Sequence, residues 1–310
     1  MYLVTGGAGF IGSNIVEALV GSGERVRVLD DLSNGTEANL TPFGDAVELV
    51  RGDIRDLATV ARAAEGAKVV LHLAALGSVQ RSVEDPATSN DVNVIGTLNV
   101  LTAARDAGAG RVVFSSSSSV YGENPTLPKT EDLTPDPISP YAATKLAGEC
   151  YARVFARVYG LDTVCLRYFN VFGPRQRPDS QYAAVIPLFM GWARDGKPLV
   201  IHGDGEQSRD FTYVDNVVRA NLLAAEAHNV SGRVFNIACG TRYSLLDIVS
   251  ALERVGGRKL ERSHTDARVG DVRHSEADIS AAADALGFEV TVGFDEGLAR
   301  TWDAFLALRA

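Results

Sequence analysis

Short apolar runs rich in Val and Leu alternate with helix-length segments through the first half of this 310-residue chain. Strands that are buried on both faces carry continuous apolar runs, and parallel strands need a long crossover between them, usually a helix. The alternation therefore predicts an α/β fold with a doubly wound parallel sheet that helices cover on both faces. The predicted strands are residues 2–6, 25–31, 47–53, 69–75, 111–117 and 163–169.

The stretch TGGAGFIG places Gly6, Gly9 and Gly12 directly after the first predicted strand and before an amphipathic helix. Such a turn aims the free N–H groups of the helix N-terminus at a diphosphate, and glycine lets the phosphate approach the backbone. The second strand ends in Asp30, where a dinucleotide-binding fold places a carboxylate that bonds the adenosine ribose and repels a 2′-phosphate. Asp53, at the end of the third strand, can reach the adenine amine. The sequence therefore predicts a Rossmann domain that binds NAD rather than NADP.

The regular alternation loosens after residue 168, where the stretch NVFGPRQRPDS is typical of a loop. The run VFNIACG is apolar again, and we expect it to return to the sheet. We therefore predict two units in the chain. They are an NAD-binding Rossmann domain at 1–168, re-entered near 212–240, and a smaller substrate-binding lobe at 169–211 and 241–310.

The composition excludes several classes of partner. The formal net charge of −9 disfavours a nucleic acid, because phosphate backbones require clustered Lys and Arg. No apolar run approaches the roughly 18 residues that span a bilayer, and the first residues lack the features of a secretion signal. We therefore expect a cytoplasmic protein without a membrane partner. Cys150, Cys165 and Cys239 lack metal-ligand spacing, so we expect buried small hydrophobic side chains and no metal site.

A hydroxyl-rich run, FSSSSSVYG, ends the fifth predicted strand, and SPYAATKLAGE, farther along the chain, opens a helix just after Pro140. Tyr141 and Lys145 are four residues apart, so they share one helical face, although such pairs are also common on solvated helices. Sites of α/β proteins form at the carboxyl ends of strands, where the serine run lies. We expect a hydroxyl from this run to meet the Tyr141 phenol above a nicotinamide.

The motifs TGGAGFIG, HLAA, SSSSSVYG, SPYAATK, LRYFNVFGP and GEQSRDFTYVDN resemble, in order, those of the extended short-chain dehydrogenase/reductases, in the NAD-dependent epimerase/dehydratase family. The resemblance covers essentially the whole chain, and the conjunction of motifs is specific. Within the family the chain looks like the UDP-sugar 4-epimerases of the UDP-galactose or UDP-N-acetylglucosamine type. The resemblance implies inversion of the C4 hydroxyl of a UDP-hexose through a transient 4-keto intermediate, with an NAD that stays bound.

The resemblance also implies roles for the polar pair. Tyr141 is expected to be the catalytic base, Lys145 its electrostatic partner and ribose anchor, and Ser117 the hydroxyl that orients the sugar O4. A free tyrosine has a pKa near 10, which makes it a poor base at neutral pH. The Lys145 ammonium and the positively charged nicotinamide are expected to favour the phenolate, because a nearby opposite charge stabilises the ionised form.

The same resemblance implies which residues contact the two ligands. Arginines among them suit a diphosphate, because their planar fork makes paired charged hydrogen bonds. The residues expected around NAD are Gly6, Gly9, Phe10, Ile11, Gly12, Asp30, Asp31, Asn34, Asp53, Ile54, Leu73, Ala74, Ala75, Asn93, Ser115, Tyr141, Lys145 and Tyr168. Those expected around the UDP-sugar are Ser78, Arg81, Ser117, Ser118, Tyr141, Asn170, Ala184, Val185, Arg209, Arg268, Asp271 and Ser275.

Other reactions run on this scaffold, because a fold alone does not fix a function. Dehydratases of the family carry an Asp–Glu pair directly before VYG, and this chain has Ser118 and Ser119 there, which favours oxidation and return over loss of water. A net reductase usually prefers NADP, which Asp30 disfavours. A non-catalytic NAD sensor typically loses the Tyr–Lys pair that this chain keeps.

The sugar stays open among hexose, N-acetylhexosamine and uronate. Ser275 stands where epimerases restricted to plain hexoses carry a tyrosine, so the resemblance implies room for an N-acetyl group at C2. A UDP-glucuronate 4-epimerase is the alternative, because Arg81, Arg175 or Arg177 can pair with a C6 carboxylate. Uronate enzymes often have Thr in place of Asn170, which weighs modestly against that alternative.

Relatives commonly dimerise through two helices of each subunit. The segments 89–108 and 139–160 are long and apolar on more than one face. We therefore expect a homodimer.

Overall fold

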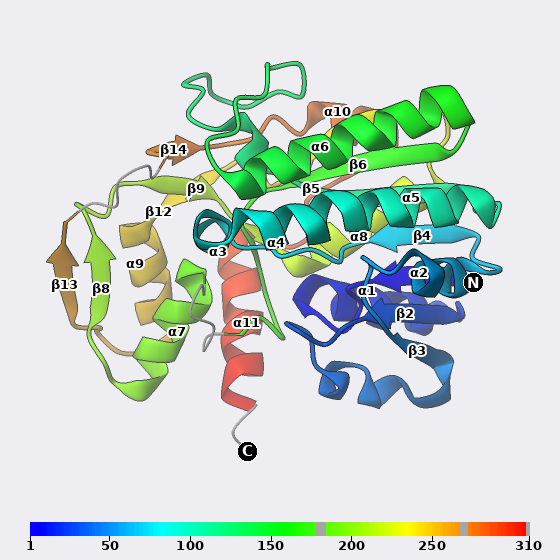
Figure 1. Ribbon diagram of the computed structural model, residues 1–310. Helices are drawn as coiled ribbons and strands as arrows, with labels where there is room; N and C mark the ends of the chain where they lie inside the picture. The colour runs from blue at the N-terminus through cyan, green and yellow to red at the C-terminus, as the bar shows by residue number, and fades with distance from the viewer. Residues whose placement is uncertain (178–183, 267–271, 308–310) are drawn as a thin grey trace.

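The computed structural model describes residues 1–177, 184–266 and 272–307. Its centre is a seven-stranded, all-parallel sheet with the strand order β11-β6-β5-β4-β1-β2-β3 (Figure 1). All six predicted strands are present, and the returning run forms the seventh. The chain order reverses between β1 and β4, where doubly wound sheets bind their ligands. The strands are β1 (Tyr2–Thr5), β2 (Val26–Asp30), β3 (Val47–Arg51), β4 (Val69–His72), β5 (Arg111–Ser117), β6 (Asp162–Tyr168) and β11 (Arg233–Ile237).

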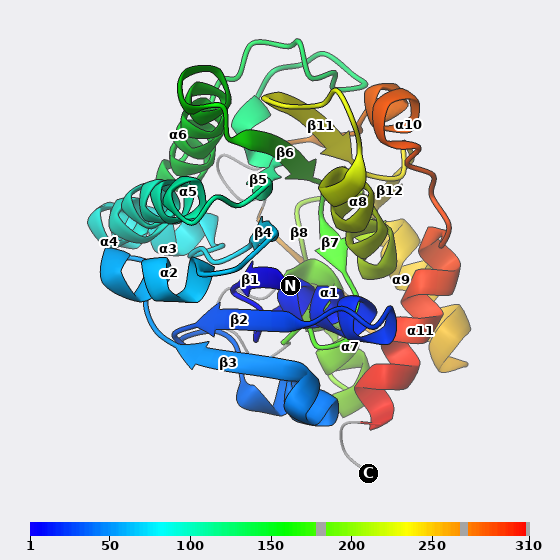
Figure 2. The same cartoon turned by 90° about the vertical axis from the view of Figure 1, so that its right-hand side faces the viewer.

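Helices cover both faces of this sheet, as the alternation predicts. Figure 2 shows α2 (Leu57–Ala64), α5 (Gly96–Asp106) and α6 (Pro140–Val154) on one side and α1 (Phe10–Gly21) and α8 (Val214–Glu226) on the other. The predicted α/β class is therefore confirmed. Shorter helical segments are η1 (Glu37–Asn39), η2 (Thr41–Ala46), α3 (Val79–Glu84), α4 (Pro86–Asn90), η3 (Asp91–Ile95), η4 (Ser118–Tyr121) and η5 (Phe155–Tyr159).

Small sheets and further helices lie beside the central sheet (Figure 1). The stretch predicted as a loop after residue 168 contains a short strand, β7 (Val171–Phe172), because it pairs in parallel with β10 (Thr212–Tyr213). The other strands are β12 (Arg242–Ser244), β9 (Ser208–Asp210) and β14 (His274–Ser275) in one sheet, and β8 (Leu199–His202) and β13 (Arg262–Thr265) in another. The helices are α7 (Val185–Asp195), α9 (Leu245–Gly256), α10 (Ser280–Leu286) and α11 (Phe294–Ala307).

One apolar core joins the central sheet to these later elements. The buried cluster contains Val4 and Leu166 from the sheet together with Phe189 from α7, Leu252 from α9 and Trp302 from α11. A contiguous cluster of this kind is what defines a single packed core. The later elements are therefore fixed against the sheet by buried apolar surface.

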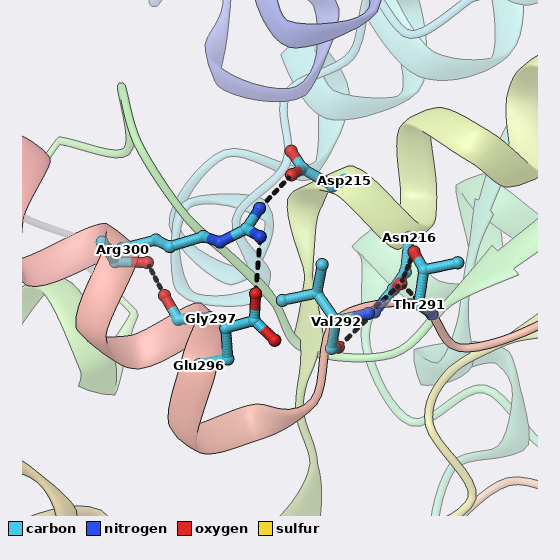
Figure 3. A network of polar contacts seen from close by, with 8 residues as sticks. Asp215, Asn216, Thr291, Val292, Glu296, Gly297 and Arg300 are labelled. Atoms are coloured by element: carbon cyan, nitrogen blue, oxygen red, sulfur yellow. Dashed lines mark hydrogen bonds and ion pairs between the residues drawn. The ribbon is translucent and has the colours of Figure 1, made fainter.

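Polar contacts also fasten the C-terminal elements to α8, as Figure 3 shows. The fully buried Asn216 accepts hydrogen bonds from the backbone N–H groups of Thr291 and Val292 and donates one to the Val292 carbonyl. At the surface beside it, Arg300 of α11 pairs with Asp215 and Glu296. The Asn216 side-chain amide therefore supplies hydrogen-bond partners to backbone groups of the irregular segment before α11, which would otherwise be buried without any.

The cysteines differ from expectation at one position. Cys165 is buried and Cys239 is half-buried, but Cys150 is exposed, so its predicted burial is wrong. Each residue of an α-helix is turned by about 100° from the one before it. Because Glu149 points to the interior, Cys150 is turned toward solvent.

Across the described ranges, no helix has both the length and the apolar character to cross a bilayer.

Candidate active site

The three glycines after β1 differ in how much space surrounds each of them. Gly6 has φ of +70°, and a Cβ there would lie 2.7 Å from the Ala74 nitrogen, so the tight turn excludes a side chain. At Gly12 a Cβ would lie 2.2 Å from the Gly6 carbonyl oxygen, which shows how closely α1 packs on the turn. Gly9 caps α1, and its Cβ would contact only the Gly6 oxygen, at 3.2 Å. The space above Gly9 and the helix N-terminus therefore fit a phosphate.

Asp30 is held at the end of β2, beside this turn. Its carboxylate accepts hydrogen bonds from the backbone N–H groups of Ala8 at 2.9 Å and of Leu32 at 2.8 Å. Burial raises the pKa of Asp30, while these two hydrogen bonds lower it. Each carboxylate oxygen can accept a further bond, so the fixed side chain fits a ribose diol. Asp53 lies farther along the same edge and is paired with Arg55.

A cavity of about 420 Å³ runs from the glycine turn along the carboxyl edge of the sheet. It brings together nearly every residue predicted to contact NAD, and Ser78 and Arg81 line it as well. The predicted residues in its wall are Gly6, Gly9, Phe10, Ile11, Gly12, Asp30, Asp31, Asn34, Asp53, Ile54, Leu73, Ala74, Ala75, Ser115, Tyr141, Lys145 and Tyr168. The glycine cradle, Asp30 and this cavity together fit a dinucleotide.

Asn93 lies behind the wall of this cavity rather than in it. Its side chain is 2% exposed and bonds the backbone N–H and carbonyl of Leu76 and the hydroxyl of Thr144. Leu76 itself lines the cavity. The predicted contact residue is therefore placed as a support for the wall, because its amide is already used by the protein.

The start of α6 positions the polar pair. Ser139 caps the helix and Pro140 occupies its first turn, so Tyr141 enters the helix directly at the cavity. The Tyr141 N–H also donates to the Ser82 hydroxyl at 3.0 Å. One turn later, the Lys145 ammonium donates to the Ser115 carbonyl oxygen at 2.8 Å and lies 5.9 Å from the centre of the Tyr141 ring.

Burial has the largest effect on the pKa values of Tyr141 and Lys145. Burial raises the pKa of Tyr141, and a hydrogen bond with Ser117 lowers it. The pKa of Lys145 is lowered to about 8, because burial lowers it by more than the nearby Glu149 carboxylate raises it. The protein around the phenol therefore favours the neutral ring, in contrast to the phenolate expected from the sequence. A phenolate at this position needs added positive charge from the cofactor side.

The serine run ends β5 and continues into η4, beside Tyr141. The Ser117 hydroxyl accepts hydrogen bonds from the N–H and the hydroxyl of Ser119. Ser118 is half-buried in the same turn. The two positions directly before Val120, Ser118 and Ser119, therefore carry hydroxyls and not carboxylates.

A second cavity, of about 460 Å³, adjoins the first across the start of α3. Ser78 lines the first cavity, and Val79, the next residue, lines the second. The second cavity collects the predicted residues Asn170, Ala184, Val185 and Arg209. Sequence reasoning missed most of its wall, including Phe172, Leu188, Val200, His202, Gln207, Phe211 and Leu245. Of these, His202 and Gln207 lie shortly before Arg209 in the sequence. Their closeness to a predicted site residue is the signal that could have identified them.

The structure places Ser275 beside this second cavity. In the pairing of β14 with β9, Ser275 is the register partner of Arg209. Arg175 points elsewhere, because it pairs with Glu17 at 2.6 Å and Asn14 on α1. The expectation that Arg175 pairs with a sugar carboxylate stays a prediction, which this ion pair does not support. Arg268 and Asp271 lie outside the described residues.

The fold and the site together define a dinucleotide-binding α/β protein with a Ser–Tyr–Lys constellation suited to hydride and proton transfer. A family model described as "NAD dependent epimerase/dehydratase family" matches residues 2–238, and the chain belongs to this family. Family membership confirms NAD as the cofactor.

Named relatives match over nearly their whole length. A UDP-glucose 4-epimerase of Mycolicibacterium smegmatis is 40% identical, with 98% of this chain and 97% of the relative covered. A UDP-glucuronate 4-epimerase of Thermodesulfobacterium geofontis is 36% identical, with coverage of 97% and 94%. The solved structure of a UDP-N-acetylglucosamine 4-epimerase from Methanobrevibacter ruminantium, in complex with UDP-N-acetylmuramic acid, superposes with a TM-score of 0.95 at 41% identity, covering 99% and 98% of the two chains.

Proposed function

We propose that the protein is an NAD-dependent UDP-hexose 4-epimerase, which inverts the C4 hydroxyl through a transient 4-keto sugar. The observation that carries this proposal is that Tyr141 and Lys145 line the first cavity together while Ser117 hydrogen-bonds Tyr141. Ser118 and Ser119 stand where an acid and a base would be needed to remove water, which supports epimerisation over dehydration. Named 4-epimerases that match almost the whole chain support the same reading.

The residues divide the work in a simple way. The Tyr141 phenolate accepts the proton of the C4 hydroxyl and returns it after the sugar has turned over. Ser117, which already hydrogen-bonds Tyr141, orients O4 toward that ring. Lys145 reaches the cavity from one turn farther along and supplies a positive charge near the ring. Bound NAD supplies a hydride acceptor and donor for C4.

The two cavities support a division of binding. We assign NAD to the domain at 1–168 with its return at 212–240, and the UDP-sugar to the lobe at 169–211 and 241–310. Arg209 and Asn170 line the second cavity, and we assign them to the diphosphate. Ser275, in register with Arg209, leaves room for an N-acetyl group, so N-acetylhexosamines are tolerated as well.

A UDP-glucuronate 4-epimerase is the second candidate. Arg81 lines the same cavity as Tyr141 and Lys145, and a relative with that name is 36% identical. This candidate needs a cation for the C6 carboxylate, and Arg81 supports it better than Arg175, because Arg175 is paired with Glu17.

We also propose a homodimer. The outer face of α6 and η5 exposes Tyr151, Val154, Val158 and Tyr159, and Ile95 is exposed on the neighbouring η3. An apolar patch on adjoining helices suits a two-fold interface with a second copy.

The cytoplasmic location stays a prediction from the sequence.

The test is to incubate the purified protein separately with UDP-glucose, UDP-N-acetylglucosamine and UDP-glucuronate and to resolve the products. We expect inversion at C4 of the first two. Inversion of UDP-glucuronate alone would favour the second candidate, and dehydration products would contradict both.

A Tyr141→Phe variant isolates the proposed base. It should fold and retain NAD but turn over roughly 10²–10⁴-fold more slowly, the usual contribution of acid–base catalysis. Tyr159→Phe, an exposed tyrosine on η5, is the matched control and should keep full activity. An active Tyr141→Phe enzyme would remove the phenol from the mechanism.

A further inference from the structure

The inward face of α6 carries a third ionisable residue that the proposed mechanism does not use. Tyr141, Lys145 and Glu149 are spaced four residues apart, so they stack on one face at intervals of about one helical turn. Glu149 is fully buried, at 0% exposure. A buried carboxylate one turn from an active-site lysine requires an explanation.

The strands under α6 hold this carboxylate at both oxygens. Arg167 of β6 makes a two-pronged contact, with Nε to Oε1 at 2.8 Å and Nη2 to Oε2 at 2.8 Å. The Ser116 hydroxyl of β5 also donates to Oε1. Ser116 and Arg167 are register partners in the pairing of β5 with β6. Glu149 is therefore tied to two adjacent strands at one level of the sheet.

This contact adjoins the active site along both chains. Ser115, the residue before Ser116, supplies the carbonyl that the Lys145 ammonium bonds. Tyr168, the residue after Arg167, lines the NAD cavity and bonds the Ser115 hydroxyl. Between Lys145 and Glu149, α6 approaches β5 so closely that a Cβ on Gly148 would lie 2.3 Å from the Phe114 ring. A shift of α6 against the sheet would therefore move Lys145 and Tyr141 together.

Stability alone does not account for the pair. A buried ion pair is often no more stabilising than apolar residues of similar volume, because desolvation offsets the attraction. The pair is, however, directional, since a bidentate guanidinium accepts one carboxylate geometry. The charged and titratable groups around Lys145 are Tyr141 and Glu149 from α6, His72 from β4, and Arg167 and Tyr168 from β6.

Among those groups, Glu149 is the one that favours the ammonium. Burial lowers the pKa of His72 to about 3 and raises the pKa of Tyr168 to about 12, so both are neutral near pH 7. Burial also raises the pKa of Tyr141. The pKa of Lys145, lowered to about 8, already includes the opposing effect of Glu149, which raises it. Loss of the carboxylate would lower the Lys145 pKa further, so the ammonium would be lost at a lower pH.

We propose that the buried Glu149–Arg167 pair is a positioning element of the active site, which holds α6 in register on β5 and β6 and keeps Lys145 charged. This inference rests on the proposed function for its catalytic consequence. The effect of the pair on the charge of Lys145 can be tested without the proposed function. Lys145 lines the NAD cavity, so this effect also appears in NAD binding.

The test is a pair of pH profiles, one of turnover and one of NAD retained after gel filtration. In Glu149→Gln the alkaline limb of both profiles should move to lower pH by about one unit, the size expected when a neighbouring opposite charge is lost. Asp162→Asn is the matched control, because Asp162 pairs with Arg111 on the same two strands at their other ends. That variant should lose stability without a shift in either profile. Profiles of Glu149→Gln that superpose on those of the wild type would overturn the proposal.

A second variant covers the case in which Glu149→Gln does not fold. The double variant Glu149→Gln, Arg167→Met removes the unpaired guanidinium and should recover stability, with a smaller shift of the profile in the same direction, because the lost cation partly offsets the lost carboxylate. Recovered stability with an unshifted profile would assign the pair a structural role only. If the wild type inverts no UDP-sugar, the proposed function fails, and the NAD-retention profile still tests the pair.

Discussion

At the scale of single residues, the site is built from positions where a change of a few atoms has a defined consequence. The glycine motif illustrates this, because its glycines are not equivalent. Gly12 is required by the packing of α1 on the turn, whereas Gly9 leaves open space at the helix N-terminus. A motif read from sequence predicts the phosphate site, but only the geometry separates the glycine that serves folding from the one that serves the ligand.

A matched pair of alanine substitutions tests this separation. Gly12→Ala should fail to fold or unfold at a much lower temperature, because its Cβ would overlap the Gly6 carbonyl oxygen at 2.2 Å. Gly9→Ala should keep the fold, since its φ of −78° suits alanine, and should weaken NAD binding by roughly tenfold or more by blocking the phosphate. Thermal melting and NAD titration separate the two effects. Equal effects of both substitutions on both measurements would contradict the distinction.

At the scale of elements, the sequence predicted the central sheet well because its strands are continuous apolar runs. The alternation predicts a doubly wound sheet, and the carboxyl ends of its strands collect Asp30, Ser115 and Tyr168. Side-chain contacts across the fold could not be predicted in this way. Asn93 supports the cavity from behind, and Arg175 turns to α1, because each finds a partner distant in sequence. The second cavity was predicted least, since its wall comes from short strands and loops without a periodic pattern.

The junction of α8 with the segment before α11 gives a test of element packing. Asn216→Ala should lower the free energy of unfolding by about 3 kcal/mol, because it leaves several buried backbone groups of Thr291 and Val292 without partners. Arg300→Ala, at the exposed pair beside it in Figure 3, should cost less than about 1 kcal/mol. Denaturant unfolding measures both values. A larger loss for Arg300→Ala would show that the surface pairs hold the junction.

At the scale of the whole molecule, one apolar core fixes the later elements on the sheet, and the two cavities adjoin at α3. This arrangement lets one ligand lie along the glycine turn and another approach Tyr141 from the side of Arg209. The exposed apolar face of α6 and η5 lies opposite the face of α6 that carries Tyr141 and Lys145. The same helix would then serve the site with one face and a second copy with the other.

Disruption of that outer face tests the proposed dimer. Val158→Arg places a charge on the most exposed apolar residue of the patch, 67% exposed, and should convert a dimer to a monomer in light scattering. Leu57→Arg, on an exposed apolar residue of α2, should leave the mass unchanged. A wild-type protein that is already a monomer of 33.0 kDa would contradict the proposal.

The central claim is that C4 of the sugar gives up a hydride and regains it within one active site, while Tyr141 moves the proton. UDP-glucose carrying deuterium at C4 tests it directly, with the products resolved by NMR and mass spectrometry. We expect a mixture of the two C4 epimers in which the deuterium stays at C4, because the hydride is never exchanged with water. Washout of the label, or no inversion at C4 in any UDP-sugar supplied with the label, would contradict the account.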